Sequence, residues 1–280
     1  MKIIKLLPFL ILNICCSAQT NLDKYVIGED GIAIEKTDSA KQFDEVYNFN
    51  NTIYIVGKKF TYSYFYQKTK GENFLIKRGK AILQPEGYST FDWEFIKLEE
   101  KDNETVNHLI LKPSSGNPFS NHIPDYNQTA IGYEYLMING KSFAMEVTGA
   151  IENEMNVWIH PPRSNFFEIL ELNPFPYIKA PYKIGTKWNW KLKIGDHWSD
   201  KRWLEWKGGI ENIYDYEIKE KKNISTKLGN LDCYIIHANA KSSIGVTELI
   251  SYFNPKFGFV KLEYKNIDGT KTILELENVE

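Results

Sequence analysis

The segment Trp188-Asn189-Trp190-Lys191-Leu192-Lys193-Ile194 alternates between apolar and polar side chains without interruption. Side chains along a β-strand point to opposite faces in turn, so this alternation predicts a strand that carries its two tryptophans on one face. The lysines and the asparagine then face water, which makes the tryptophan face the buried one. Similar alternation on both sides of this segment extends the prediction to most of the chain.

Two stretches predict β-hairpins, because alternating runs flank a pair of turn residues. Asn139-Gly140 joins residues 133–138 to 141–147, and Asp268-Gly269 joins residues 260–264 to 272–276. Both pairs are typical of type I′ turns, whose two central residues take positive φ. Further strands are expected at 52–56, 60–66, 88–98, 105–111, 214–218 and 234–236, with 88–98 and 105–111 paired as a hairpin.

These patterns predict a mainly β fold: a curved antiparallel sheet, either a half-barrel or an open sandwich, with one or two short helices. The helices are expected at residues 38–47 and 165–172. A signal peptide at 1–18 is followed by a β-rich N-terminal half (19–160), a Pro-rich seam (161–181) and a curved antiparallel C-terminal half (182–280). Residues 113–129 show no period, which predicts a covering or mobile loop.

The first residues predict export. Lys2 and Lys5 precede a short apolar run, and the small residues of Cys16-Ser17-Ala18 predict cleavage before Gln19. A lipid attached at Cys15 or Cys16 is the alternative. The expected location is therefore periplasmic or secreted, or the outer membrane if the chain is lipid-anchored. After removal of the signal peptide, no apolar run reaches the roughly 20 residues that span a bilayer.

Charge and motif content exclude several classes of function. A net charge of −2 and a pI of about 6.3 argue against a nucleic-acid partner. Cys233 is the one cysteine outside the predicted signal peptide, so we expect no internal disulfide and a buried structural thiol. Nucleophile elbows, phosphate-binding glycine loops and zinc-protease histidine spacings are missing. The sequence identifies no catalytic residue, metal ligand or cofactor, and it favours a protein that is not an enzyme.

Aromatic residues make up 14% of the chain, and six of the seven tryptophans lie within residues 158–206. Tryptophan faces suit both sugar stacking and the walls of an apolar cavity. The alternative is that these large rings simply fill the concave side of the sheet. The candidate ligand-binding residues are Trp158, His160, Arg163, Trp188, Trp190 and Trp203.

Three motifs of the C-terminal part carry a resemblance. They are Gly185-Thr186-Lys187-Trp188-Asn189-Trp190, then Leu228-Gly229-Asn230-Leu231-Asp232-Cys233-Tyr234, then Tyr252-Phe253-Asn254-Pro255-Lys256-Phe257-Gly258-Phe259-Val260-Lys261. Residues 185–277 resemble the broad group of LolA/LolB-like and uncharacterised exported Gram-negative envelope proteins. The resemblance implies a concave apolar face for lipid or lipoprotein tails, and it assigns no residue a role.

The sequence thus favours an exported, non-catalytic binding or scaffold module for a hydrophobic or amphiphilic ligand. One alternative is a glycan-binding or glycan-hydrolysing protein that uses the Trp-rich segment. The other alternative is a structural or assembly partner without a small ligand.

Overall fold

The computed structural model describes residues 24–27, 31–36, 51–114 and 128–280. The predicted signal peptide, the helix expected at 38–47 and most of the aperiodic 113–129 segment lie outside these residues. The first strands are β1 (Tyr25–Ile27), β2 (Ala33–Glu35), β3 (Phe60–Gln67), β4 (Asn73–Leu83), β5 (Ser89–Lys97), β6 (Val106–Ser114), β7 (Thr129–Met137), β8 (Ser142–Glu152) and β9 (Asn156–Ile159). The others are β10 (Tyr177–Lys179), β11 (Lys187–Ile194), β12 (Ile210–Thr226), β13 (Gly229–Ser242), β14 (Gly245–Asn254), β15 (Gly258–Lys265) and β16 (Lys271–Val279). Three short 3₁₀ helices are η3 (Leu98–Glu100), η4 (Asn165–Leu172) and η5 (Asp196–Trp198).

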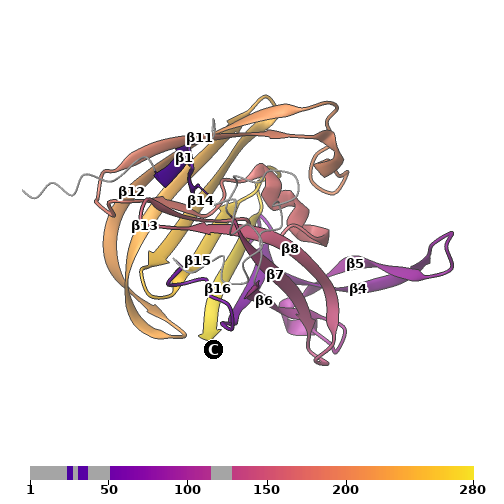
Figure 1. Cartoon of the computed structure of the whole chain (residues 1–280). Coiled ribbons are helices and arrows are strands. Elements are labelled where there is room, and N and C mark those ends of the chain that lie inside the picture. Colours follow the sequence, from indigo (N-terminus) through magenta and orange to yellow (C-terminus); the bar gives the residue numbers. More distant parts are fainter. Residues whose placement is uncertain (1–23, 28–30, 37–50, 115–127) are drawn as a thin grey trace, which may run out of the picture.

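Within the described residues, β3 to β16 form one 14-stranded antiparallel sheet that curves into a barrel-like body (Figure 1). Its main order is β10-β9-β8-β7-β6-β3-β16-β15-β14-β13-β12-β11, and β4 and β5 branch from β3. The predicted class, a mainly β protein with a curved antiparallel sheet, is confirmed. β3 pairs with both β16 and β6, so hydrogen bonding continues from strands of the N-terminal half into strands of the C-terminal half.

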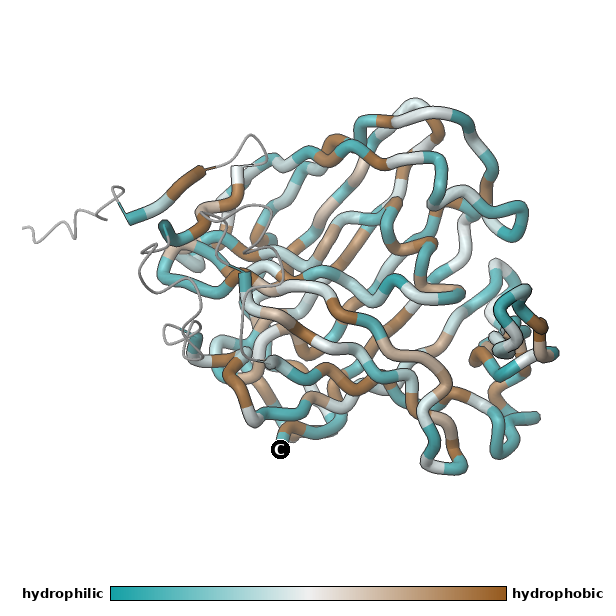
Figure 2. The backbone as a smooth tube through the Cα atoms, turned by 45° about the vertical axis from the view of Figure 1, so that its right-hand side comes forward, coloured by the Kyte–Doolittle hydropathy of each residue, from teal (hydrophilic) through white to brown (hydrophobic). Residues whose placement is uncertain are grey.

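Alternation along the strands decides which side chains enter the core. β11 buries Trp188, Trp190 and Ile194 and exposes the lysines between them, as its sequence predicts. β3 likewise buries Phe60 and three tyrosines at every second position. Figure 2 shows hydrophobic and hydrophilic residues alternating along the long strands.

The inside of the curve is filled by η4, whose bounds confirm the helix expected at 165–172. Phe166 packs edge-on against Tyr66 of β3, with ring centroids 4.9 Å apart. Phe167 packs in the same way against Tyr64 at 5.1 Å. The interior is therefore a packed aromatic core that a buried helical turn completes.

Both predicted hairpins form, but the type I′ prediction for their turns was wrong. Gly140 and Gly269 have φ of 79° and 80°, whereas Asn139 and Asp268 are not among the residues with positive φ. The Gly140 N–H donates to the Met137 carbonyl, and the Met137 N–H donates to the Lys141 carbonyl. This is the pattern of a three-residue loop in which glycine follows the turn in the left-handed region. One extra residue in each loop removes the need for positive φ at the Asn or Asp.

The expected hairpin between 88–98 and 105–111 was also wrong. β5 pairs with β4 alone, and β6 pairs with β3 and β7. The turn at Gln84–Tyr88 brings β5 back along β4, so the nearer partner in sequence takes its hydrogen bonds. The resulting β4–β5 hairpin projects from the body of the molecule (Figure 1).

Residues 52–56, expected as a strand, form a bend whose backbone binds a carboxylate. The N–H groups of Thr52, Ile53 and Tyr54 donate to the Glu152 carboxylate at 2.6–2.9 Å. A charge-assisted hydrogen bond is stronger than a neutral one. Glu152 thus satisfies the backbone N–H groups that would otherwise hydrogen-bond to a partner strand.

β10 and β11 are the two ends of the sheet order and do not pair with each other, so side chains close the gap between them. Tyr177 of β10 packs edge-on against Trp188 of β11 at 5.4 Å, and Trp158 of β9 packs edge-on against Trp190 at 6.1 Å. We call these four rings the closure cluster.

Backbone near the chain's first strands crosses the same gap. The Ala33 N–H donates to Asn156 Oδ1 at 2.9 Å, and Asn156 Nδ2 donates back to the Ala33 carbonyl at 3.1 Å. Lys179 Nζ donates to the Gly31 carbonyl at 3.2 Å. A Cβ on Gly31 would lie 3.4 Å from the Asn189 carbonyl oxygen of β11. Residues 31–33 thus lie against β9, β10 and β11 together.

We expect Trp190→Ala to lower the free energy of unfolding by about 3–5 kcal/mol, because it removes a fully packed ring from the closure cluster. Lys191→Ala, on the exposed face of the same strand, is the matched control and should change it by less than about 0.5 kcal/mol. Urea denaturation followed by circular dichroism measures both. A Trp190→Ala loss as small as that of the control would show that the cluster does not hold the sheet closed.

Candidate functional site

The structure brings together three of the tryptophans that the sequence singled out. Trp158, Trp188 and Trp190 are only 4–6% exposed. Trp190 stacks on Tyr214 at 4.5 Å, and Trp188 stacks on Tyr216 at 5.3 Å. Other rings therefore cover the faces that sugar stacking would need, and packing accounts for their clustering.

His160 lies beside this group, whereas Arg163 hydrogen-bonds to Glu146 and Val147 of β8. The His160 ring is 6.0 Å from Trp158 and 4.7 Å from Phe175. Trp203 instead donates its indole N–H to the Trp198 carbonyl at 3.3 Å. A ligand-binding role for the six candidate residues stays a prediction.

His160 and Glu171 form a buried pair inside the barrel, with His160 Nε2 3.3 Å from Glu171 Oε1. His160 Nδ1 lies 2.7 Å from the Pro161 carbonyl oxygen, which can only accept, so Nδ1 carries a proton. Burial lowers the pKa of His160 to about 3 and raises the pKa of Glu171 to about 8. At neutral pH the pair is therefore uncharged, and the protonated Glu171 faces the unprotonated Nε2.

A half-buried carboxylate, that of Glu146, fixes the start of η4. Glu146 accepts hydrogen bonds from the Arg163 N–H at 2.8 Å, the Ser164 hydroxyl at 2.5 Å and the Tyr135 hydroxyl at 2.9 Å. Burial raises the pKa of Glu146, and these three donors oppose that shift. Glu146 thus ties η4 to β7 and β8, which is a structural task.

Cys233 of β13 also has a structural role. Cys233 is fully buried and free, and burial raises the pKa of its thiol to about 11. A thiol with such a pKa is a poor nucleophile at neutral pH. In residues 24–27, 31–36, 51–114 and 128–280, no three His, Cys, Asp or Glu side chains gather as metal ligands.

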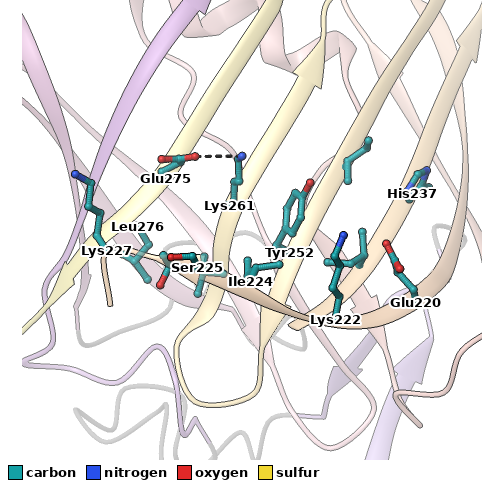
Figure 3. A pocket seen from close by; sticks show the side chains of 14 residues that line it. Glu220, Lys222, Ile224, Ser225, Lys227, His237, Tyr252, Lys261, Glu275 and Leu276 are labelled. Atoms are coloured by element: carbon teal, nitrogen blue, oxygen red, sulfur yellow. Dashed lines mark ion pairs between the residues drawn. The ribbon is translucent and has the colours of Figure 1, made fainter. Parts of the chain in front are cut away.

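A pocket lies on the other face of the sheet, where the β12–β13 hairpin bends. The β12–β13 register shifts between Ile218 and Glu220, and a bulge of this kind bends a strand. Beyond it, residues 220–233 form what we call the arm. Figure 3 shows the β12 part of the arm crossing β14, β15 and β16.

The face beneath the arm is the outer face of the sheet. Tyr252, Lys261 and Glu275 point toward the arm (Figure 3), whereas their buried neighbours Ser251 and Leu262 point inward. The pocket between arm and sheet has a volume of about 290 Å³. Its apolar lining is Ile224, Ile235, Ile250, Tyr252, Val260 and Leu276; its polar lining is Glu220, Lys222, Ser225, Thr226, Lys227, His237, Lys261 and Glu275.

An ion-pair network organises the sheet side of this pocket. Lys261 Nζ lies 2.8 Å from Glu263 and 3.1 Å from Glu275. The Tyr252 hydroxyl donates to Glu263 at 3.3 Å, which joins this pocket-lining ring to the network. The site can therefore offer apolar surface and fixed charges to the same ligand.

Comparisons with known proteins assign this chain to no family. No family model and no curated protein matches it. Similar solved structures include a protein designated a lipoprotein from Parabacteroides distasonis, with 12% identity and a TM-score of 0.44 over 81% of this chain and 97% of that one. An exported protein with a YmcC-like fold from Bacteroides fragilis has 10% identity and a TM-score of 0.40 over the same shares. The hypothetical lipoprotein YmcC from Escherichia coli has 9% identity and a TM-score of 0.34 over 86% and 92%.

These neighbours include exported proteins and lipoproteins, and none of the three is named after LolA or LolB. With TM-scores below 0.5, function has to be argued from the residues of this chain. No helix in the part of the chain that the structure describes is both long and apolar enough to cross a membrane.

Sequence reasoning missed the arm pocket. The signal available was the lysine-rich run Lys219-Glu220-Lys221-Lys222, where the alternation that begins at Tyr214 stops. A break in alternation inside a long strand indicates a bulge, and bulges often lie beside binding sites.

We expect the raised pKa of Glu171 to make stability depend on pH. Between pH 4.5 and 8 the folded chain holds a proton on Glu171 that the unfolded chain releases, so the free energy of unfolding falls as the pH rises. Glu171→Gln should remove a slope of up to about 1.4 kcal/mol per pH unit in that range. Glu205→Gln, an exposed glutamate, should leave the slope in place.

Thermal unfolding measured from pH 3 to 9 tests this expectation. The lowered pKa of His160 has the opposite sign: stability falls as the pH drops from 6.5 to 3, because the unfolded chain binds the proton first. Parallel curves for wild type and Glu171→Gln between pH 4.5 and 8 would show that Glu171 is ionised in the fold.

Cys233→Ala should cost about 1 kcal/mol of stability, the usual scale of a single substitution, and leave ligand binding unchanged. Iodoacetamide should label the native thiol at pH 7.5 far more slowly than the thiol of urea-unfolded chain, measured by mass spectrometry. Equal labelling rates would identify an accessible, activated thiol.

Proposed function

We propose that the chain is an exported, non-catalytic binding module of the bacterial envelope, and that its ligand is amphiphilic and held in the arm pocket. The observation that carries this proposal is the lining of the pocket, where six apolar residues lie beside lysines, glutamates and a histidine. Export is supported by the signal-peptide pattern of residues 1–18.

The size of the pocket favours one segment of a ligand rather than a large molecule. Small-molecule sites usually enclose about 300–1,000 Å³, so 290 Å³ lies at the lower end of that range. Ile250 and Tyr252 are only partly buried and offer apolar surface that a hydrocarbon chain can cover. Each Å² of apolar surface removed from water contributes about 25 cal/mol.

Binding without catalysis fits the location of the buried pair His160–Glu171. Glu171 and His160, which have the large pKa shifts, lie in the inner core, and the sheet separates them from the pocket on its outer face. Glycan binding through Trp188 and Trp190 would need open ring faces, but Tyr216 and Tyr214 stack on them. The amphiphile proposal therefore has the stronger support.

Calorimetric titration with dodecyl maltoside, below its critical micelle concentration, tests the proposal. We expect saturable binding to wild type that weakens about tenfold in Ile250→Gln, because the substitution puts an amide on the apolar floor. Ile213→Gln is the control, a more exposed outer-face isoleucine of β12 that does not line the pocket.

Unchanged stability of both variants in thermal melts would show that the pocket alone was altered. Absence of binding by any dodecyl amphiphile would contradict the proposal and favour an assembly partner without a small ligand.

A further inference from the structure

The run along β12 that crosses the pocket carries an excess of positive charge. Residues 219–227 read Lys-Glu-Lys-Lys-Asn-Ile-Ser-Thr-Lys, four lysines against one glutamate. Lys219 pairs with Glu217 at 2.5 Å, and Lys221 lies over the Tyr234 ring at 5.2 Å. Lys222 and Lys227 are the two lysines of the run that line the pocket.

The carboxylates of the sheet beneath are already occupied. Glu263 and Glu275 share Lys261, and Glu248 pairs with Lys265 at 2.7 Å. Within the described part of the chain, no ion pair involves Lys222 or Lys227. The pocket therefore holds two exposed cations that an anionic group could approach.

Lys222 and Lys227 lie on either side of an apolar part of the pocket. Lys222 and Ile224 share one face of the arm, since alternate residues of a strand point the same way. Glu220 lies beside Lys222 at the His237 end, and Lys227 lies at the opposite end near Leu276 (Figure 3). The Lys227 end is thus the cationic end, and Ile224 lies between it and Lys222.

We infer that the ligand of the arm pocket is an anionic amphiphile, with its carboxylate or phosphate at Lys227, its hydrocarbon over Ile224, Ile250 and Tyr252, and Lys222 adding positive potential from the far side of Ile224. This inference rests on the proposed function of the pocket. Lysine is a compact point charge on a flexible stem, so it can follow either head group. A cationic head group would be repelled by Lys227 at that end, where Glu275 of the sheet is already paired with Lys261.

Three single-chain probes below their critical micelle concentrations test the head-group charge: dodecyl phosphate, dodecyl maltoside and dodecyltrimethylammonium. Calorimetry should show dodecyl phosphate binding at least tenfold more tightly than the maltoside, and the cationic probe most weakly. Raising NaCl from 50 to 500 mM should reduce this preference, because salt screens exposed charges.

The double variant Lys222→Gln/Lys227→Gln should lose about tenfold in affinity for dodecyl phosphate and keep its affinity for the maltoside. The matched control is Lys193→Gln/Lys241→Gln, which removes the same charge from exposed lysines of β11 and β13. All four lysines are exposed, so both variants should melt within a few degrees of wild type.

The outcomes separate this inference from the proposed function. Equal binding of the phosphate and maltoside probes would overturn the anionic head group and leave the amphiphile site intact. Binding of none of the probes would overturn both. Inorganic phosphate that binds as tightly as dodecyl phosphate would overturn the amphiphile and identify a simple anion site.

Discussion

The structure depends on closing a long antiparallel sheet whose two end strands share no hydrogen bonds. Exposed strand edges pair readily with other strands, so a curved sheet needs something to occupy the gap between them. Here the rings of Trp158, Tyr177, Trp188 and Trp190 pack across the β10–β11 gap, and residues 31–33 run along it. This explains why Trp158, Trp188 and Trp190 lie together, because large rings span a distance that backbone hydrogen bonds would otherwise cover.

Closure of this kind decides where a ligand can bind. The inner face is filled by η4, by the closure cluster and by the neutral pair His160–Glu171, whose desolvation stabilises uncharged forms. The outer face remains, and the bulge after Ile218 turns part of a long hairpin back over it. The concave side of the sheet is thus packed and a pocket lies on its convex side, whereas the resemblance described above implies a binding face on the concave side.

Local sequence patterns predict the strands well and their partners poorly. The alternation of Trp188–Ile194 fixes a strand and its buried face, because burial and period are both local properties. Asn139-Gly140 locates a turn but not its length, since one extra loop residue changes which positions need positive φ. The partner of β5 and the arm over β14–β16 depend on contacts between distant segments, and such contacts leave no period in the sequence. The tryptophans were therefore recognised as a group, while Lys222 and Lys227 looked like ordinary surface charge.

The pairing of β3 with β16 has a consequence for how the chain reaches this structure. Phe60 lies opposite Val279, so a ladder in the middle of the sheet joins segments separated by most of the sequence. Contacts between residues so far apart in the sequence slow folding, because the entropy of closing the loop is lost before the stabilising contacts form. Until β16 has been synthesised and has paired with β3, one edge of β3 is open to other strands. During synthesis from the N-terminus this edge stays open until β16 is available, and open strand edges pair readily with other strands.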